Sequence, residues 1–129
     1  MNYNILYLIG EIPTPVIIMI VAISIWRCPP KQSENFGYRT RRSQLSEEAW
    51  NAAQILYGKY AAIMFAVTSA ATVIAGLIIV IIDPDEDTSF VLFLVITAAQ
   101  VGVLMAVIAM VEHKLKILFD ENGKPRELE

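Results

Sequence analysis

The chain has 129 residues, 56% of them hydrophobic, and a formal net charge of −3. Its length suits a single domain, and a soluble domain of this size could not bury so large an apolar fraction. We therefore expect lipid to cover much of the surface, and the acidic balance argues against nucleic acid as a partner. Cys28 is the single cysteine, which excludes an internal disulfide and a cysteine-based metal cluster.

Three segments are long and apolar enough to cross a bilayer, which takes about 20 residues of helix. They cover about residues 5–26, 60–82 and 90–111, and the second belongs to a longer helix over about 51–82. No basic stretch or cleavage signal accompanies the first segment, so we expect it to remain as an anchor. The sequence thus predicts an all-α membrane protein, a single domain over residues 1–129 with three transmembrane helices.

The first segment is interrupted by the stretch from Gly10 to Pro15, which includes Glu11 and Pro13. Proline in a helix interior removes a hydrogen bond, so we expect a kink here or a helix that starts near Pro13. Glu11 is the one charge in the segment, about 24 Å from Arg27 along a helix. It is either a hydrated carboxylate near the far membrane surface or a contact for an ion, a proton or a peptide.

Small residues recur at four-residue spacing in the second and third segments, a pattern that lets helices pack closely in lipid. They are Gly58, Ala62, Ala66 and Ala70, with Thr72 and Gly76, and then Ala98, Gly102 and Ala106. Gln100 is strongly polar at mid-depth, so we expect it to face another helix. These features predict tight helix packing and a homo-oligomer.

The loop over residues 27–50 is the longest polar stretch. Proline at 29 and 30 ends the first helix, and Gly37 can take the positive φ of a tight turn. Ser46 can cap a helix that starts at about Glu47. This basic loop is predicted to be structured, either as a folded cap plugged by Trp50 or as a pocket for a ligand, partner or ion.

The turn over residues 83–89 is acidic, and Asp83 and Asp85 belong to it. It is either a hydrated tip or a cation site, although its carboxylates do not have the spacing of an EF-hand loop. All Lys and Arg residues lie in or near the loop and in the tail over 112–129. Because Lys and Arg favour the cytoplasmic side, we expect the N-terminus and the acidic turn outside and the loop and C-terminus in the cytoplasm.

The loop also carries a family resemblance. The matching residues are Pro29, Pro30, Lys31, Asn35, Gly37, Tyr38, Arg39, Thr40, Arg42, Ser43, Glu48, Trp50, Ala53, Gln54, Gly58 and Lys59. This string resembles the SdpI family of bacterial membrane proteins, which also has three membrane segments in this order. Two positions depart from the family pattern: Arg41, where proline is frequent, and Gln54, where asparagine is common.

The resemblance implies a bacterial cytoplasmic membrane protein that confers immunity against a secreted peptide toxin. It also implies a cytoplasmic regulator, because the best-known member draws a soluble repressor to the membrane. That member has an additional membrane domain before this one, which we expect to be absent here. The family pattern marks Pro30, Asn35, Gly37, Tyr38, Arg39, Thr40, Ser43, Trp50 and Gln54 as site residues.

Two other functions remain open from the residues. A small oligomeric transporter or channel would use Glu11, Gln100, Asp83 and Asp85 along its path. A lipid-surface adaptor would use the basic loop to bind anionic headgroups, with membrane lipids as partners. We find no set of residues arranged for catalysis, a phosphate loop or a metal site, so we expect no enzyme activity, no cofactor and no metal.

Overall fold

Three long helical rods make up the structure, a computed structural model that describes residues 2–126. The helical elements are α1 (Tyr3–Glu11), α2 (Pro13–Arg27), the short 3-10 helix η1 (Arg42–Gln44), α3 (Glu47–Ile82) and α4 (Glu86–Leu118). Taken together, α1 and α2 form one rod, and this rod, α3 and α4 are each long and apolar enough to cross a membrane. The predicted all-helical architecture is confirmed, with three helical rods that have the length and composition to cross a membrane.

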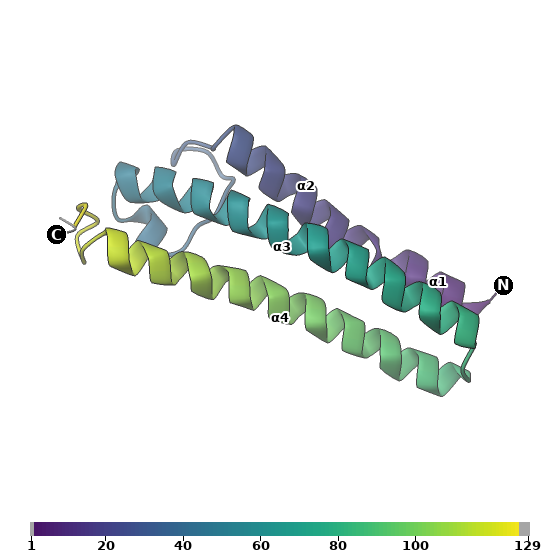
Figure 1. Cartoon of the computed structure of the whole chain (residues 1–129). Helices are drawn as coiled ribbons and strands as arrows, with labels where there is room; N and C mark the ends of the chain where they lie inside the picture. The colour runs from purple at the N-terminus through teal and green to yellow at the C-terminus, as the bar shows by residue number, and fades with distance from the viewer. Residues whose placement is uncertain (1, 127–129) are drawn as a thin grey trace.

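The rods lie side by side, and the two ends of the bundle differ (Figure 1). One end, the turn end, holds the N-terminus and the α3–α4 turn. The opposite end, the loop end, holds the long α2–α3 loop, η1 and the segment after α4. Helix α3 is central, since α2 and α4 both pack on it, while α1 contacts both α3 and α4.

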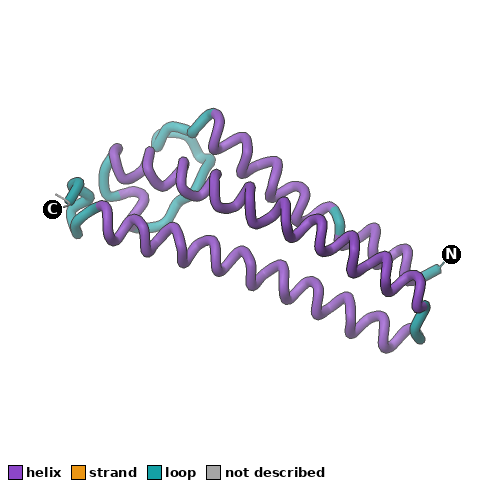
Figure 2. Tube along the Cα trace, in the orientation of Figure 1, coloured by secondary structure: helices purple, strands orange, loops and turns teal. Residues whose placement is uncertain are grey.

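The first rod is interrupted at Ile12, between α1 and α2 (Figure 2). Pro13 occupies the first turn of α2, where a missing N–H costs nothing. Pro15 lies two residues further and cannot donate to the carbonyl of Glu11, four residues before it. The interruption predicted between Gly10 and Pro15 is therefore present, and it leaves carbonyl groups of α1 in need of other partners.

Small residues let the rods approach closely at two places. A Cβ on Gly58 of α3 would lie 2.7 Å from the backbone nitrogen of Trp26, and one on Gly76 would overlap Leu8. Replacing Gly58 would require the backbone of α2 to move, whereas replacing Gly76 would require the Leu8 side chain to move. The small columns are only partly used within the chain, because Ala66 and Ala70 of α3 and Ala98, Gly102 and Ala106 of α4 are exposed. A second copy as their neighbour stays a prediction.

Helix α3 is longer than a membrane requires. Its 36 residues span about 54 Å, whereas the hydrocarbon core is about 30 Å thick. The predicted cap is present, because the Ser46 hydroxyl accepts a hydrogen bond from the Ala49 amide at 3.0 Å. The first turns of α3 thus project beyond the apolar part and provide a surface on which the loop folds.

The segment after α4 reverses direction. Helix α4 ends at Leu118, and residues 119–126 fold back. Asp120 causes the reversal, since its carboxylate accepts hydrogen bonds from the amides of Asn122 and Lys124, both at 2.9 Å. The Lys124 amide holds the pKa of Asp120 below its usual range. Residues 127–129 lie outside the described residues.

Candidate functional site

Gln54 of α3 holds the loop by its backbone. Its amide oxygen accepts from the Tyr38 N–H and its amide nitrogen donates to the Tyr38 carbonyl, both at 2.7 Å. Gln54 is fully buried and Tyr38 is 7% exposed. The side chain therefore makes the same pair of hydrogen bonds to Tyr38 that a neighbouring β-strand would make. It provides partners for the Tyr38 N–H and carbonyl, which would otherwise be buried without any.

Gly37 makes this approach possible. Its φ is 120°, a backbone conformation that favours glycine. A Cβ at this position would lie 2.6 Å from the Gln54 amide oxygen and 2.8 Å from Pro30. Pro30 is itself anchored, because its carbonyl accepts from the indole N–H of the buried Trp50 at 2.8 Å. Four of the residues that carry the sequence motif thus form one packed unit.

Thr40 and Ser43 close the next turn of the loop. The Thr40 amide donates to the Ser43 hydroxyl at 2.9 Å, and the Ser43 amide donates back to the Thr40 hydroxyl at 3.3 Å. The Ser43 hydroxyl lies 2.8 Å from the Thr40 carbonyl and 3.2 Å from the Tyr38 carbonyl, either of which can accept its proton. Ser43 is fully buried, so its role in the structure is to satisfy the backbone of η1 and the turn before it.

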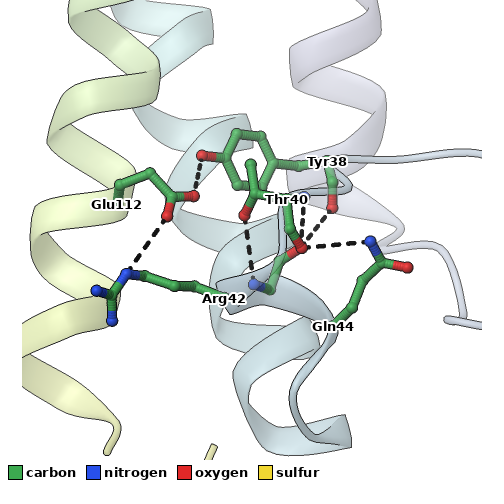
Figure 3. A network of polar contacts seen from close by, with 6 residues as sticks. Tyr38, Thr40, Arg42, Gln44 and Glu112 are labelled. Carbon is green, nitrogen blue, oxygen red and sulfur yellow. Dashed lines mark hydrogen bonds and ion pairs between the residues drawn. The ribbon is translucent and has the colours of Figure 1, made fainter. Parts of the chain in front are cut away.

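Glu112 ties the loop to α4. The Tyr38 hydroxyl donates to one of its carboxylate oxygens at 2.6 Å, and the Arg42 guanidinium lies 3.8 Å from the other (Figure 3). Burial and the Glu112 carboxylate raise the pKa of the Tyr38 phenol above its usual range. The Tyr38 ring also stacks on Tyr57 of α3, with 5.2 Å between ring centroids. One side chain of the loop therefore reaches both α3 and α4.

The three loop arginines differ in their surroundings. Arg42 faces Glu112, whereas the Arg39 guanidinium lies 4.8 Å from the centre of the Trp50 ring and donates to the Gln32 carbonyl at 3.1 Å. A cation over a Trp face is a favourable contact. Arg41 is exposed. The loop, which we call the loop cap (residues 28–46), is thus folded onto α3 and α4.

A groove lies between the loop cap and the neighbouring parts of α2, α3 and α4. It encloses about 470 Å³. Val21, Ile25, Leu104 and Ile108 give it apolar walls from α2 and α4, and Asn35 and the turn around Gly37 close its end. Asn35 is exposed, and its side chain makes no hydrogen bond to residues 2–126. The folded-cap and pocket interpretations of the loop are both compatible with this arrangement.

A family model for the SdpI/YfhL protein family matches residues 31–112, more than half of the chain. The chain belongs to the SdpI/YfhL family. No curated protein and no solved structure matches it. The SdpI/YfhL match begins in the loop cap and ends at Glu112, the residue on α4 that Tyr38 and Arg42 contact. Together with the three apolar rods, it identifies a multi-pass membrane protein.

In the acidic turn of this SdpI/YfhL protein, the Asp83 and Asp85 carboxylates accept hydrogen bonds from other groups of the protein. Asp83 has a φ of 52° and accepts from the side-chain amide of Asn4 at 2.9 Å. Asp85 caps α4 through the amide and hydroxyl of Thr88, which lower the pKa of its carboxyl. Within residues 2–126, no group of three or more His, Cys, Asp and Glu side chains is arranged to hold a metal ion.

Glu11 and Gln100 lie together rather than at separate depths. The Glu11 carboxylate accepts from the Thr97 hydroxyl of α4 at 2.6 Å. Gln100 is 5% exposed and donates to Thr72 of α3 at 3.2 Å and to the Glu11 carbonyl at 3.4 Å. The expectation that Gln100 faces another helix is confirmed. Glu11 is half-buried and hydrogen-bonded, which differs from the freely hydrated carboxylate that we considered.

Several members of these contacts were not identifiable from the sequence. Asn4 and Thr97 carry no pattern that separates them from other polar residues of an apolar helix, and Thr72 was visible only as a member of a small-residue column, without its hydrogen-bond partner. Tyr57 and Glu112 were visible only as an interfacial aromatic and as one of several carboxylates available to the arginines. Their partners lie far away in the chain, and only the packing of the rods shows which pairs meet.

Proposed function

We propose that this SdpI/YfhL family member is an immunity protein of the bacterial cytoplasmic membrane, which protects the cell from a secreted peptide toxin. The observation that carries the proposal is the family match over residues 31–112, which includes the motif residues that build the loop cap. A cytoplasmic regulator is proposed as a second partner. The apolar groove beneath the cap supports it, because such a groove can accept an apolar side chain of a partner.

The proposed orientation places the loop end in the cytoplasm. All ten Lys and Arg residues lie toward the loop end, where the loop cap and the segment after α4 meet. Among residues 2–126, the charged side chains of the turn end are all acidic, and they include Asp85, Glu86 and Asp87. Because Lys and Arg are retained on the cytoplasmic side, this asymmetry supports an external turn end. A toxin arriving from outside would then meet the acidic turn first.

A survival assay in the native host tests this proposal. Deletion of the gene should sensitise cells to a secreted peptide toxin, and the full chain supplied in trans should restore survival. The Gly37→Ala variant, whose new Cβ disrupts the loop cap, should restore less at equal abundance in the membrane. Gly10→Ala is the matched control, since a Cβ there meets nothing within 4 Å. Unchanged survival after deletion would count against immunity to that toxin.

A small oligomeric transporter or channel is the second candidate function. The contacts among Glu11, Thr97 and Gln100 favour it, because polar groups at membrane depth mark substrate and ion paths. A lipid adaptor has less support, since two of the three loop arginines are occupied by Trp50 and Glu112. Ion flux into liposomes that contain the purified chain would favour the transporter, and flux equal to that of empty vesicles would count against it.

A further inference from the structure

A polar cleft opens beside the break between α1 and α2, within the apolar part of the bundle. It encloses about 220 Å³, and we call it the Glu11 cleft. Its polar lining consists of Glu11 and Thr14 from the first rod and Thr97 and Gln100 from α4. Glu11 lies about 12 Å along the helix from Tyr3, and Thr97 about 16 Å from Glu86. The cleft is thus well inside the span, where a bare carboxylate is costly.

The break in the helix supplies oxygen atoms to this region. Pro13 and Pro15 lack the N–H groups that would pair with the carbonyls of Ile9 and Glu11 in a continuous helix. The Gln100 amide nitrogen supplies a replacement donor for the Glu11 carbonyl at 3.4 Å. Interrupted helices at membrane depth are tolerated where they line a cavity, and their free carbonyls coordinate small cations in membrane proteins.

Two side chains retain oxygen atoms without partners. The Gln100 amide uses its nitrogen for Thr72 and Glu11, and its oxygen accepts no hydrogen bond from residues 2–126. Gln100 as a whole is 5% exposed, but this oxygen is not among the fully buried atoms without a partner, so it remains accessible. One Glu11 carboxylate oxygen accepts from Thr97, while the other has no partner within the same range. Residues that carry a carboxylate, an amide and a hydroxyl therefore line one cavity.

We propose that the Glu11 cleft binds a single monovalent cation, either an alkali ion or a primary ammonium group. Glu11 is the one ionisable side chain among the described residues that line it. A charge of +1 would neutralise this carboxylate, whereas a divalent ion would leave one positive charge uncompensated at membrane depth. The donors are all oxygen atoms, which suits hard cations and ammonium groups rather than soft transition metals.

Thermal unfolding of the purified full chain in nanodiscs tests the site with salts alone. Sodium, potassium, lithium and methylammonium chloride are each compared with N-methylglucamine chloride at equal ionic strength, because the large cation cannot enter 220 Å³ beside the lining groups. Binding to the folded state raises Tm with cation concentration. We expect at least one small cation to raise Tm in this way, and the responding salt separates an alkali ion from an ammonium group.

Three variants tie the effect to the cleft. Glu11→Gln should abolish the difference in Tm between salts, whatever its own basal Tm. Thr97→Val, which removes the hydrogen bond that orients the carboxylate, should require about tenfold more cation for the same shift. Glu34→Gln removes the same charge from the exposed loop cap and should keep the wild-type response. If Glu11→Gln does not fold, the cation titration of Thr97→Val tests whether the rise in Tm depends on the Glu11 cleft.

Three results would overturn the proposal. They are equal Tm values in all salts, a full response in the Glu11→Gln variant, and an infrared carboxylic acid band at neutral pH that Glu11→Gln removes. The last would show a proton in place of the cation. Because no toxin is used, the result is independent of the immunity proposal, and each can fail alone.

Discussion

Gln54 bonds to the loop cap through both polar atoms of its side chain. The Tyr38 carbonyl has the Ser43 hydroxyl as a second partner at 3.2 Å, whereas the Tyr38 N–H has Gln54 alone among the described residues. The value of the amide therefore lies mainly in satisfying that buried N–H. A buried donor left without a partner costs about 1–3 kcal/mol.

Gln54→Leu should accordingly lower the free energy of unfolding by about 1–3 kcal/mol and expose the loop cap to protease, while the bundle stays helical. Asn51→Leu is the matched control, because it also replaces an amide side chain by leucine, and Asn51 lies on the exposed face of the same helix. Denaturant titration in detergent with limited proteolysis measures both effects. Equal stability of the two variants would contradict the role assigned to Gln54.

Gly37→Ala should destabilise the loop cap by about 1–3 kcal/mol, the usual cost of a strained backbone conformation. The added Cβ meets Gln54 and Pro30 in addition, at 2.6 and 2.8 Å. Gly10→Ala should be neutral or mildly stabilising, since Gly10 is helical and its Cβ would meet nothing within 4 Å. The two thermal unfolding curves test this, and a Gly37→Ala protein as stable as wild type would show that the turn is not constrained.

The Tyr38 phenol gives the loop cap a dependence on alkaline pH. Its pKa is raised in the folded state by burial and by Glu112, so the folded state holds the proton more tightly. The associated stability is present in full below the ordinary tyrosine pKa of about 10 and is lost as pH rises through the folded value. Tyr38→Phe should therefore flatten the fall in Tm above pH 10. An unaltered Tyr38→Phe profile would contradict the assignment.

At the scale of elements, Ser46 connects the start of α3 to the segment after α4. Its hydroxyl accepts from the Ala49 amide at 3.0 Å and donates to the Gly123 carbonyl at 2.6 Å. Gly123 has a φ of 78°, and a Cβ there would lie 2.7 Å from that of Leu45. The loop cap and the C-terminal turn are therefore a joint structure at the loop end.

Two substitutions separate the functions of Ser46. Ser46→Ala should lose both contacts and cost about 0.5–2 kcal/mol, the usual value of a helix cap. Ser46→Asp keeps an acceptor for the Ala49 amide but has no proton for Gly123, so it should keep the stability of α3 while residues 119–126 open. Hydrogen exchange of the Ala49 amide measures the helix cap, and exchange of the amides in residues 119–126, such as that of Gly123 bonded to the Asp120 carbonyl, measures the opening of that segment. Protection of residues 119–126 in both variants would show that the Gly123 contact is not required.

The helices and their caps were largely predictable, because apolar length, proline and capping residues act locally. Ser46, Gly37 and the break near Pro13 lie where the sequence indicated. The end of α4 was not predictable, since it depends on the turn that Asp120 sets and that Ser46 holds through the Gly123 carbonyl. The local sequence indicates that a residue lies in a turn, whereas contacts between distant segments determine the conformation of that turn.

At the scale of the whole molecule, charge divides the bundle into two ends. The three loop arginines look alike in sequence, yet one lies near Glu112, one lies over Trp50 and one is exposed. The partners of Tyr38 and Asn4 lie 74 and 79 residues away along the chain. Such pairs depend on how the rods pack, which is why the loop could be recognised from the sequence while its contacts could not.

Cys28 offers a direct test of orientation, since it is exposed and is the single cysteine of the chain. A membrane-impermeant maleimide should label it only after cells are permeabilised. Asp85→Cys in a Cys28→Ser background should be labelled in intact cells, because the turn end is proposed to lie outside. The reverse pattern would invert the topology and place the loop cap on the external face.

The most direct measurement for the proposed function is survival of a toxin-sensitive host that expresses this chain alone. Cells with the wild-type chain in the membrane should survive a secreted peptide toxin that kills cells with an empty vector. Gly37→Ala at equal abundance should protect less than Gly10→Ala, because only the former disturbs the loop cap. Killing of wild-type and vector cells at the same dose, for every peptide toxin the native host encounters, would contradict the proposed role.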